Sequence, residues 1–253
     1  MQQKKIGDIL KKNNLKDFLE YVSSKGFYSS EKRLKFKLEQ FFGGVDLRDK
    51  NVLDIGGGIG LLSFYAVLKG AKNSLCLEPL GDGSTSNVHQ LFYDIKQKLN
   101  LNNVMISSKM FQELEDDTQY DLVVLHNSIN HLNEYACINL KKDGIAYSEY
   151  LEYFNKFNRL LKKGGEIIIS DCSCYNFWEM IKLKNPIDPN IEWFKHQSPS
   201  MWSRIAKEAD FTVTDISWNS FNRLGRVGKF LFGRSVVSFF LTSHFTIYAK
   251  KNG

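Results

Sequence analysis

The nine residues VLDIGGGIG at positions 52–60 decide the fold of this chain. A short apolar run ends in four glycines within five residues, and the apolar run 61–68 follows as an expected helix. Glycines at a strand-to-helix junction let the backbone turn tightly and let a ligand approach the main chain and the helix N-terminus. The stretch therefore predicts a strand, a ligand-binding turn and a helix in sequence.

Short apolar runs alternate with helical patterns along most of the chain. The alternation predicts an α/β fold with a mainly parallel sheet covered by helices. The expected helices are residues 4–20, 31–42, 61–68, 86–99, about 145–161 and 198 to about 209. The expected strands are residues 51–55, 74–77, 104–107, 120–125, 166–170, 211–218 and 245–250.

Two residues distinguish the glycine loop from the loop of a dinucleotide-binding domain. The pattern GxGxxG, started at Gly56, requires a glycine where this chain has Leu61. Asp54 precedes the loop, where its carboxylate would repel a pyrophosphate but favour a cationic ligand. A dehydrogenase is therefore disfavoured.

Five landmarks in the order of one known family extend over about residues 50–250. The glycine loop resembles motif I of the class I S-adenosylmethionine (SAM)-dependent methyltransferases, an acid followed by GxGxG. Glu78 stands where that family places an acid on the SAM ribose hydroxyls. Residues 120–132, 161–165 and 207–211 are similar to its fourth strand, the turn before its fifth strand and the entry to its sixth.

The resemblance implies a Rossmann-like, doubly wound seven-strand sheet, mostly parallel and ending in a C-terminal antiparallel hairpin. Residues 1–48 would form an N-terminal helical cover, and residues 49–253 the class I methyltransferase domain. SAM would be the cofactor. The expected SAM-binding residues are Asp54, Gly56, Gly57, Gly58, Gly60, Glu78, Met110, Phe111 and His126.

The segment after the third expected strand departs from the family pattern. The family often has an acid here that accepts a hydrogen bond from the adenine amino group, whereas this chain has Lys109, Met110 and Phe111. Either Met110 or Phe111 packs against the adenine ring, or a main-chain group holds it. Equally, both side chains fill the core.

Two residues are candidates for catalysis. Methyl transfer requires alignment and often a base that takes the acceptor's proton. The resemblance places His131 where the family faces the methyl donor and the acceptor, and Asp171 follows the expected strand 166–170. We expect His131 or Asp171 to position or deprotonate the acceptor; the alternatives are a packed histidine and a loop-capping aspartate.

Polar and aromatic side chains predict an acceptor pocket. One cluster follows the expected fifth strand, and a second precedes the helix that begins at Ser198. The second cluster resembles a segment of methyltransferases of bacterial surface-glycan pathways, but the same residues would also suit a brace between helices. The expected substrate-binding residues are Tyr175, Asn176, Trp178, Glu192, Trp193, His196 and Gln197.

The function expected from these patterns is transfer of a methyl group from SAM to a hydroxyl. The acceptor would be a sugar, a nucleotide sugar or another small polar metabolite, which points to carbohydrate modification. Two alternatives stay open: methylation of a nitrogen or carbon acceptor, and a SAM-binding protein that is active only with a partner. Apolar residues of the helix 31–42 could serve a homodimer interface instead of a lid.

The chain carries 34 basic and 28 acidic residues, and its excess of positive charge lies near the C-terminus. Residues 216–253 contain no acid and six basic side chains: Arg223, Arg226, Lys229, Arg234, Lys250 and Lys251. The aromatic, basic segment 219–243 could cover the core, contact an anionic acceptor or rest on an anionic membrane surface. Because the basic residues are confined to one segment, we do not expect the protein to bind nucleic acid.

The remaining sequence features indicate a cytoplasmic enzyme. The N-terminal residues show no apolar core of an export signal. The four cysteines lack CxxC spacing, which favours reduced thiols over a metal site. We expect no bound metal.

Overall fold

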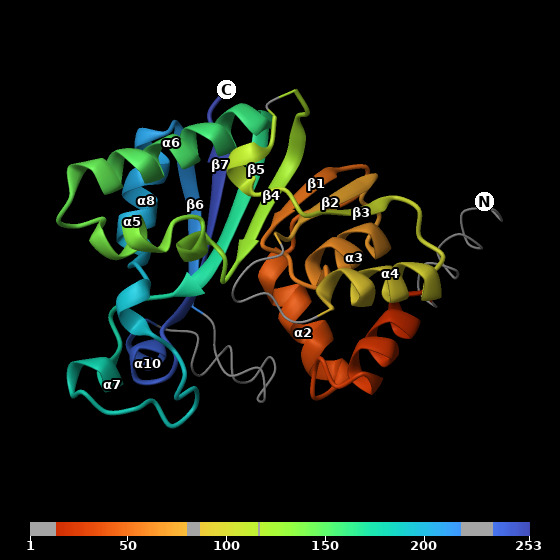
Figure 1. Cartoon of the computed structure of the whole chain (residues 1–253), viewed down its shortest axis with the longest axis horizontal. Helices are drawn as coiled ribbons and strands as arrows, with labels where there is room; N and C mark the ends of the chain where they lie inside the picture. Colours follow the sequence, from red (N-terminus) through yellow and green to blue (C-terminus); the bar gives the residue numbers. More distant parts are fainter. Residues whose placement is uncertain (1–13, 80–86, 116, 219–234) are drawn as a thin grey trace. The chain divides into compact units, whose positions relative to one another are not determined.

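The computed structural model of the chain describes residues 14–79, 87–115, 117–218 and 235–253 (Figure 1). The chain divides into two compact units, Met1–Leu114 and Glu115–Gly253. The boundary expected between an N-terminal cover and a main domain, at residues 48 and 49, stays a prediction.

The first unit is built on three parallel strands. Strand β1 pairs with β2, and β2 pairs with β3. Helix α3 packs against β1 and β2, and α4 packs against β3 (Figure 1). Residues 14–24 are also helical. The elements are α2 (Glu31–Phe42), β1 (Asn51–Ile55), α3 (Leu61–Leu68), β2 (Asn73–Leu77), α4 (Val88–Lys98), β3 (Val104–Ser107) and the 3₁₀ turn η1 (Phe111–Glu113).

Helix α2 begins and ends as its sequence predicts. The Ser30 side chain accepts a hydrogen bond from the Arg33 amide, and Gly43 ends the helix with a φ of 59°. Its apolar face is buried, and the Phe42 ring stacks on Tyr65 of α3 with the ring centroids 5.4 Å apart. The helix is therefore held by its apolar face rather than by propensity alone.

The second unit contains four strands. Strand β5 pairs in parallel with β4 and antiparallel with β7, which pairs antiparallel with β6. The elements are β4 (Tyr120–His126), η2 (Ile129–His131), α5 (Glu134–Asn139), α6 (Gly144–Leu160), β5 (Leu161–Cys172), α7 (Phe177–Met180), η3 (Trp193–Lys195), α8 (Pro199–Glu208), β6 (Phe211–Trp218), α10 (Ser235–Phe240) and β7 (His244–Lys251).

The strand order of the seven-stranded sheet is β3-β2-β1-β4-β5-β7-β6. Only the C-terminal strands run antiparallel. The expected mostly parallel seven-strand sheet with a C-terminal antiparallel hairpin is therefore confirmed.

The start of β5 differs from the expectation. Residues 161–165 were expected as a turn before the strand, but the structure includes them in β5. The pairing with β4 jumps from Tyr120 opposite Leu161 to Leu122 opposite Glu166, and Gly164 has a φ of 70°. The turn-forming glycines thus make an irregularity inside the strand rather than end it.

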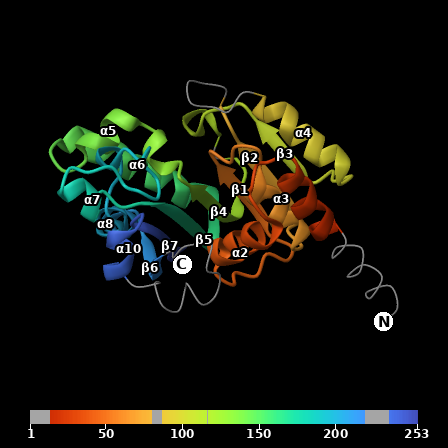
Figure 2. The ribbon, with the colours of Figure 1, turned by 90° about the horizontal axis from the view of Figure 1, so that it is seen from below.

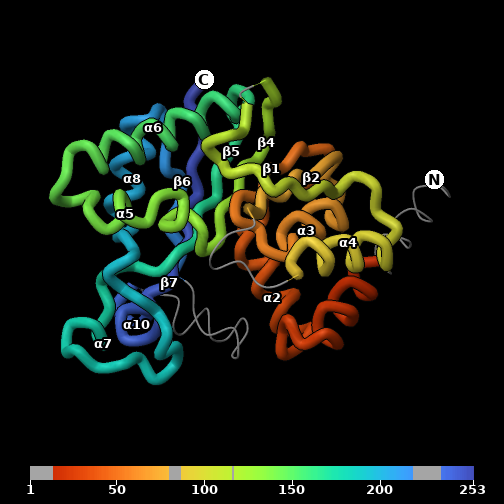
Figure 3. Tube along the Cα trace, in the orientation of Figure 1, coloured from red at the N-terminus to blue at the C-terminus, as the bar shows by residue number. Residues whose placement is uncertain are grey.

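Beyond the end of β5, the chain makes an excursion before it returns to the sheet. Figure 3 follows it from β5 through α7 and back to α8. Helices α7 and α10 lie side by side in both ribbon views (Figures 1 and 2). Part of the expected helix 4–20 and part of the aromatic, basic segment 219–243 lie outside the described residues; residues 235–240 of that segment form α10.

Candidate functional site

The glycine loop of the first unit requires glycine at nearly every position. Gly56, Gly58 and Gly60 have φ angles of 67°, 57° and 79°, in the left-handed region that favours glycine. A Cβ on Gly57 would lie 2.5 Å from the Cys76 sulfur, and one on Gly60 would lie 2.6 Å from the Phe92 ring. The loop therefore packs tightly on its neighbours.

Gly58 is the exception, because it faces open space. A Cβ at this position would meet no atom within 4 Å. The Gly58 amide donates a hydrogen bond to Glu78 Oε2 at 2.9 Å. The loop and the acid after β2 are thus already joined, beside space that a ligand can enter.

Asp54 lies beneath the loop with no exposed surface. Its Oδ2 accepts hydrogen bonds from the Ser63 amide at 3.2 Å and from Ser63 Oγ at 2.9 Å. Burial raises the pKa of this carboxyl to about 7 even though both Ser63 bonds oppose the shift. The carboxyl thus joins the end of β1 to the first turn of α3.

Glu78 stays partly exposed after β2. While Oε2 holds the glycine loop, Oε1 makes no hydrogen bond with a described residue. The ring of His89 in α4 contacts the Glu78 main-chain oxygen at 3.0 Å. The geometry leaves one carboxylate oxygen available for ligand hydroxyls.

The two residues after β3 have different surroundings. Phe111 is 2% exposed, whereas Met110 is 53% exposed. The Met110 amide donates to Glu113 Oε2 at 2.8 Å, which fixes the turn η1. Of the two side chains expected to pack a ring, only Met110 is open to a ligand in this structure.

In the second unit, the two histidines near β4 lie in unlike surroundings. His126 is the last residue of β4, and its ring centroid lies 6.0 Å from that of His244. His131 ends η2 with its side chain 62% exposed, and its Nδ1 lies 3.7 Å from Glu134 Oε2. No tight hydrogen bond from a described residue orients the His131 ring.

Asp171, by contrast, is fully buried and bonded to a histidine. Its Oδ1 contacts His196 Nδ1 at 2.9 Å and accepts the Cys172 amide at 2.8 Å. Its Oδ2 is buried without a hydrogen-bond partner among the described residues. The structure thus brings together two predicted site residues from β5 and from the segment before α8.

The first predicted acceptor cluster divides into internal and exposed side chains. Asn176 is fully buried, and its Nδ2 donates to Phe239 O, Leu241 O and Ser243 Oγ. The Trp178 indole donates to the Phe240 carbonyl at 2.8 Å. Asn176 and Trp178 therefore fasten the loop after β5 to α10.

Tyr175 is the exposed member of this cluster. Its side chain is 58% exposed, and its hydroxyl lies 3.2 Å from Lys141 Nζ. The ammonium group also lies 4.6 Å from the centre of the Tyr175 ring. A cation is thus held at the surface of the loop that follows Asp171.

The second predicted cluster is held to α5. Gln197 is 3% exposed and donates from Nε2 to the Cys137 carbonyl at 2.6 Å, and Trp193 is 5% exposed. The exposed Glu192 pairs with Lys195 at 2.8 Å. These contacts brace the segment before α8, while His196 keeps 14% side-chain exposure.

The comparisons with known proteins agree with this geometry. The sequence profile of a family described as "Methyltransferase domain" matches residues 28–216. This chain belongs to the methyltransferase domain family. Among curated proteins, none matches its sequence.

Solved methyltransferase structures share the fold. A SAM-dependent methyltransferase from Clostridium acetobutylicum is 15% identical, with a TM-score of 0.57 over 92% of this chain and 96% of that one. One from Mesorhizobium loti is 11% identical, with a TM-score of 0.55 over 85% and 96%. The 1,6-didemethyltoxoflavin-N1-methyltransferase from Burkholderia thailandensis, with bound S-adenosylhomocysteine, is 14% identical, with a TM-score of 0.56 over 94% and 87%.

SAM is the cofactor of this methyltransferase, and the first unit fits it. The open space at Gly58 and the available Oε1 of Glu78 suit a ligand with a ribose. The roles of the individual residues, including Asp54, Met110 and His126, stay predictions.

Sequence reasoning missed several residues that hold the second unit's predicted site. Cys137 and Lys141 lie in or after α5, a helix that the sequence did not predict, and contact the predicted clusters through a carbonyl and an ammonium group. His244 lies beside His126 only because β7 folds back on β5. The one signal in the sequence was that His244 directly precedes the last expected strand, residues 245–250.

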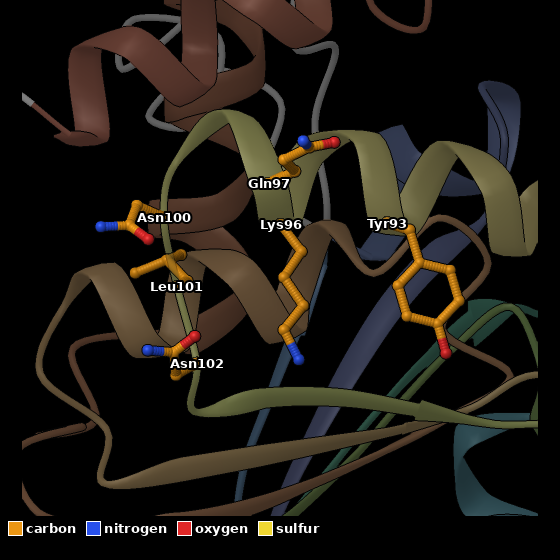
Figure 4. Close-up of a pocket in the computed structure, with 6 residues that line it drawn as sticks. All are labelled: Tyr93, Lys96, Gln97, Asn100, Leu101 and Asn102. Carbon is orange, nitrogen blue, oxygen red and sulfur yellow. The ribbon is translucent and has the colours of Figure 1, made fainter.

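A surface pocket of about 390 Å³ contains none of the predicted residues (Figure 4). It is lined by Tyr93, Lys96, Gln97, Asn100, Leu101 and Asn102, all from α4 and the turn after it. In the part of the chain that the structure describes, no group of acidic, histidine or cysteine residues suits a metal ion, and no helix is long and apolar enough to cross a membrane.

Proposed function

We propose that this methyltransferase transfers a methyl group from SAM to a hydroxyl of a sugar, a nucleotide sugar or another small polar metabolite. The proposal includes the expectation that this methyltransferase acts in carbohydrate modification. SAM supplies an electrophilic methyl group when it is bound. The first unit's glycine loop and Glu78 would hold it, and residues around Asp171 would act on the acceptor.

One observation carries the choice of a hydroxyl acceptor. Asp171 is a buried carboxylate bonded to the imidazole of His196 at 2.9 Å. A hydroxyl is a weak nucleophile that gains from a positioned proton acceptor. A neutral amine already carries a nucleophilic lone pair and needs no such group, so the pair favours oxygen methylation over nitrogen methylation.

The exposed Tyr175 and Lys141 support a polar acceptor. Their hydroxyl and ammonium group lie together on the surface, and Tyr175 follows Asp171 by four residues in the chain. Aromatic rings pack against sugar faces, and ammonium groups pair with phosphates. Both features suit a sugar or a nucleotide sugar.

An acceptor screen tests this proposal. Purified protein is incubated with SAM and with paired acceptors that differ only in carrying a hydroxyl or an amine at one position. Mass spectrometry would detect a gain of one methylene, and NMR would locate the new methyl group. We expect an O-methyl product; an N-methyl or C-methyl product would contradict the proposed acceptor class.

A further inference from the structure

The Asp171–His196 pair has a defined polarity. An ionised carboxylate only accepts hydrogen bonds, so the imidazole must donate from Nδ1 across the 2.9 Å contact. The second ring nitrogen, Nε2, then carries the lone pair. It makes no hydrogen bond with a described residue, and the side chain keeps 14% exposure. The pair therefore presents a proton-accepting nitrogen.

The residues on both sides of His196 are bonded to one residue of α5. Cys137 donates from Sγ to the Lys195 carbonyl at 3.4 Å, and its own carbonyl accepts from Gln197 Nε2 at 2.6 Å. Ser198 then caps α8. The imidazole is thus positioned by its neighbours as well as by Asp171.

The charged groups around this segment leave the pair intact. The ammonium of Lys195 is occupied by Glu134 Oε1 at 3.0 Å and Glu192 Oε2 at 2.8 Å, so it does not compete for Asp171. Burial raises the pKa of the Cys137 thiol to about 12, which keeps it protonated. Cys172, next to Asp171, is buried as well, and its thiol pKa is also raised by burial.

We propose that His196 is the catalytic proton acceptor and that Asp171 is its positioning residue. This inference rests on the proposed function, because it assigns the proton of the acceptor hydroxyl. The O–H bond breaks and its proton goes to Nε2. The oxygen electron pair forms the new C–O bond to the methyl group, whose bond to sulfur breaks to leave S-adenosylhomocysteine. The imidazolium then releases its proton to water.

The proposal separates His196 from the other predicted base. His131 is exposed, and its nearest carboxylate contact is 3.7 Å long. A general base needs a fixed direction toward the proton it takes. The His196 ring is bonded to the buried carboxylate of Asp171 at 2.9 Å, whereas no described carboxylate lies within hydrogen-bond distance of the His131 ring.

The first test needs no acceptor. NMR of ¹⁵N-histidine-labelled protein reports which ring nitrogen carries the proton. At alkaline pH we expect His196 to be protonated on Nδ1 alone, and the Asp171→Ala variant, which removes the acceptor of the Nδ1 proton, to lose this preference. The matched control Asp121→Ala removes a carboxylate that pairs with Lys162 in the same unit and should leave the His196 signals unchanged. A wild-type His196 protonated on Nε2 would overturn the proposal.

The second test uses the acceptor from the screen. We expect His196→Gln to lower kcat by about 10²- to 10⁴-fold with little change in KM, and to remove the fall in rate at acid pH. His131→Gln should lower kcat by a smaller factor. Retention of the wild-type kcat and acid limb in His196→Gln would overturn the assignment.

Failure of the proposed function and failure of the role of His196 give different results. If the product carries its new methyl group on nitrogen or carbon, the proposed function fails whatever the variants do. If the product is an O-methyl compound and His196→Gln keeps the wild-type pH profile, only the role of His196 fails. Binding of S-adenosylhomocysteine to each variant, measured by calorimetry, should match the wild type and thus exclude misfolding.

Discussion

The glycine loop of the first unit and the loop after β5 in the second unit are built by different means. The glycine loop uses main-chain groups, positive φ angles and one carboxylate, Glu78, bonded to the Gly58 amide. The loop after β5 uses side chains that meet across long stretches of sequence, as Asp171 and His196 do. A loop built on main-chain conformation leaves a recognisable glycine pattern in the sequence. A contact between two distant side chains is visible only in the folded structure.

The largest expected effect comes from a substitution in the glycine loop. Gly58→Arg should abolish SAM binding, because the side chain would fill the open space beside Glu78. Gly26→Arg is the matched control, since Gly26 also has a positive φ, of 77°, and open space around it. Both variants should lose about 1–2 kcal/mol of stability from backbone strain. Calorimetry with S-adenosylhomocysteine should show binding to the control alone; equal binding to both would contradict the site.

The next largest effect concerns the loop after β5 in the second unit. Asn176→Ala should lower the free energy of unfolding by roughly 2–4 kcal/mol, because the buried Asn176 side chain donates to three acceptors that would lose the Nδ2 group. Tyr175→Phe, at its exposed neighbour, should change it by less than about 0.5 kcal/mol. Urea denaturation would measure both. Similar stabilities for the two variants would mean that Asn176 does not fasten the loop.

A smaller effect concerns the pH dependence of stability. The raised pKa of Asp54, about 7 in the folded state against an ordinary 3.8, means that the folded chain holds a proton that the unfolded chain has lost. The stability from this group is complete below about pH 4 and is lost as the pH rises through 7. The free energy of unfolding of Asp54→Asn, relative to that of the wild type, should therefore be higher at pH 8 than at pH 5.

The control for this experiment is Asp46→Asn. Asp46 is exposed, and its bonds to Arg48 lower its pKa to about 2, so it stays ionised across the same interval. Urea denaturation at pH 5 and pH 8 should show no pH-dependent difference from wild type for this variant. An equally flat difference for Asp54→Asn would contradict the assigned burial effect.

The smallest effect tests the acid after β2. Glu78→Gln keeps an oxygen for the Gly58 amide but removes the charge available to ligand hydroxyls. We expect affinity for S-adenosylhomocysteine to fall about 10-fold, the value of one charge-assisted hydrogen bond. Glu113→Gln, an acid after β3 that holds only its own turn, should bind as wild type does. Unchanged affinity in Glu78→Gln would remove this residue from the site.

The sequence predicted the strands and the glycine loop because local patterns specify them. Residues 51–55, 104–107 and 211–218 are strands with the expected bounds. The start of β5 was not foreseen, since Gly164 reads as a turn until its strand is paired with β4. Helix α5 was missed because it is six residues long.

For the candidate site, the sequence indicated which residues to consider but not how they contact one another. Asp171 and His196 were both expected to contact the acceptor, but their direct bond depends on how the segment before α8 is tied to Cys137. Phe111 and Met110 were equivalent in the sequence, and only the packing of η1 separates the buried ring from the exposed side chain.

Calorimetric titration of the purified wild-type protein with SAM, S-adenosylhomocysteine and NAD shows directly which ligand the glycine loop holds. The glycine loop and Glu78 predict binding of the first two with dissociation constants on the order of micromolar and no binding of NAD. Binding of NAD, with no heat from SAM or S-adenosylhomocysteine, would mean that the glycine loop holds a dinucleotide and not SAM.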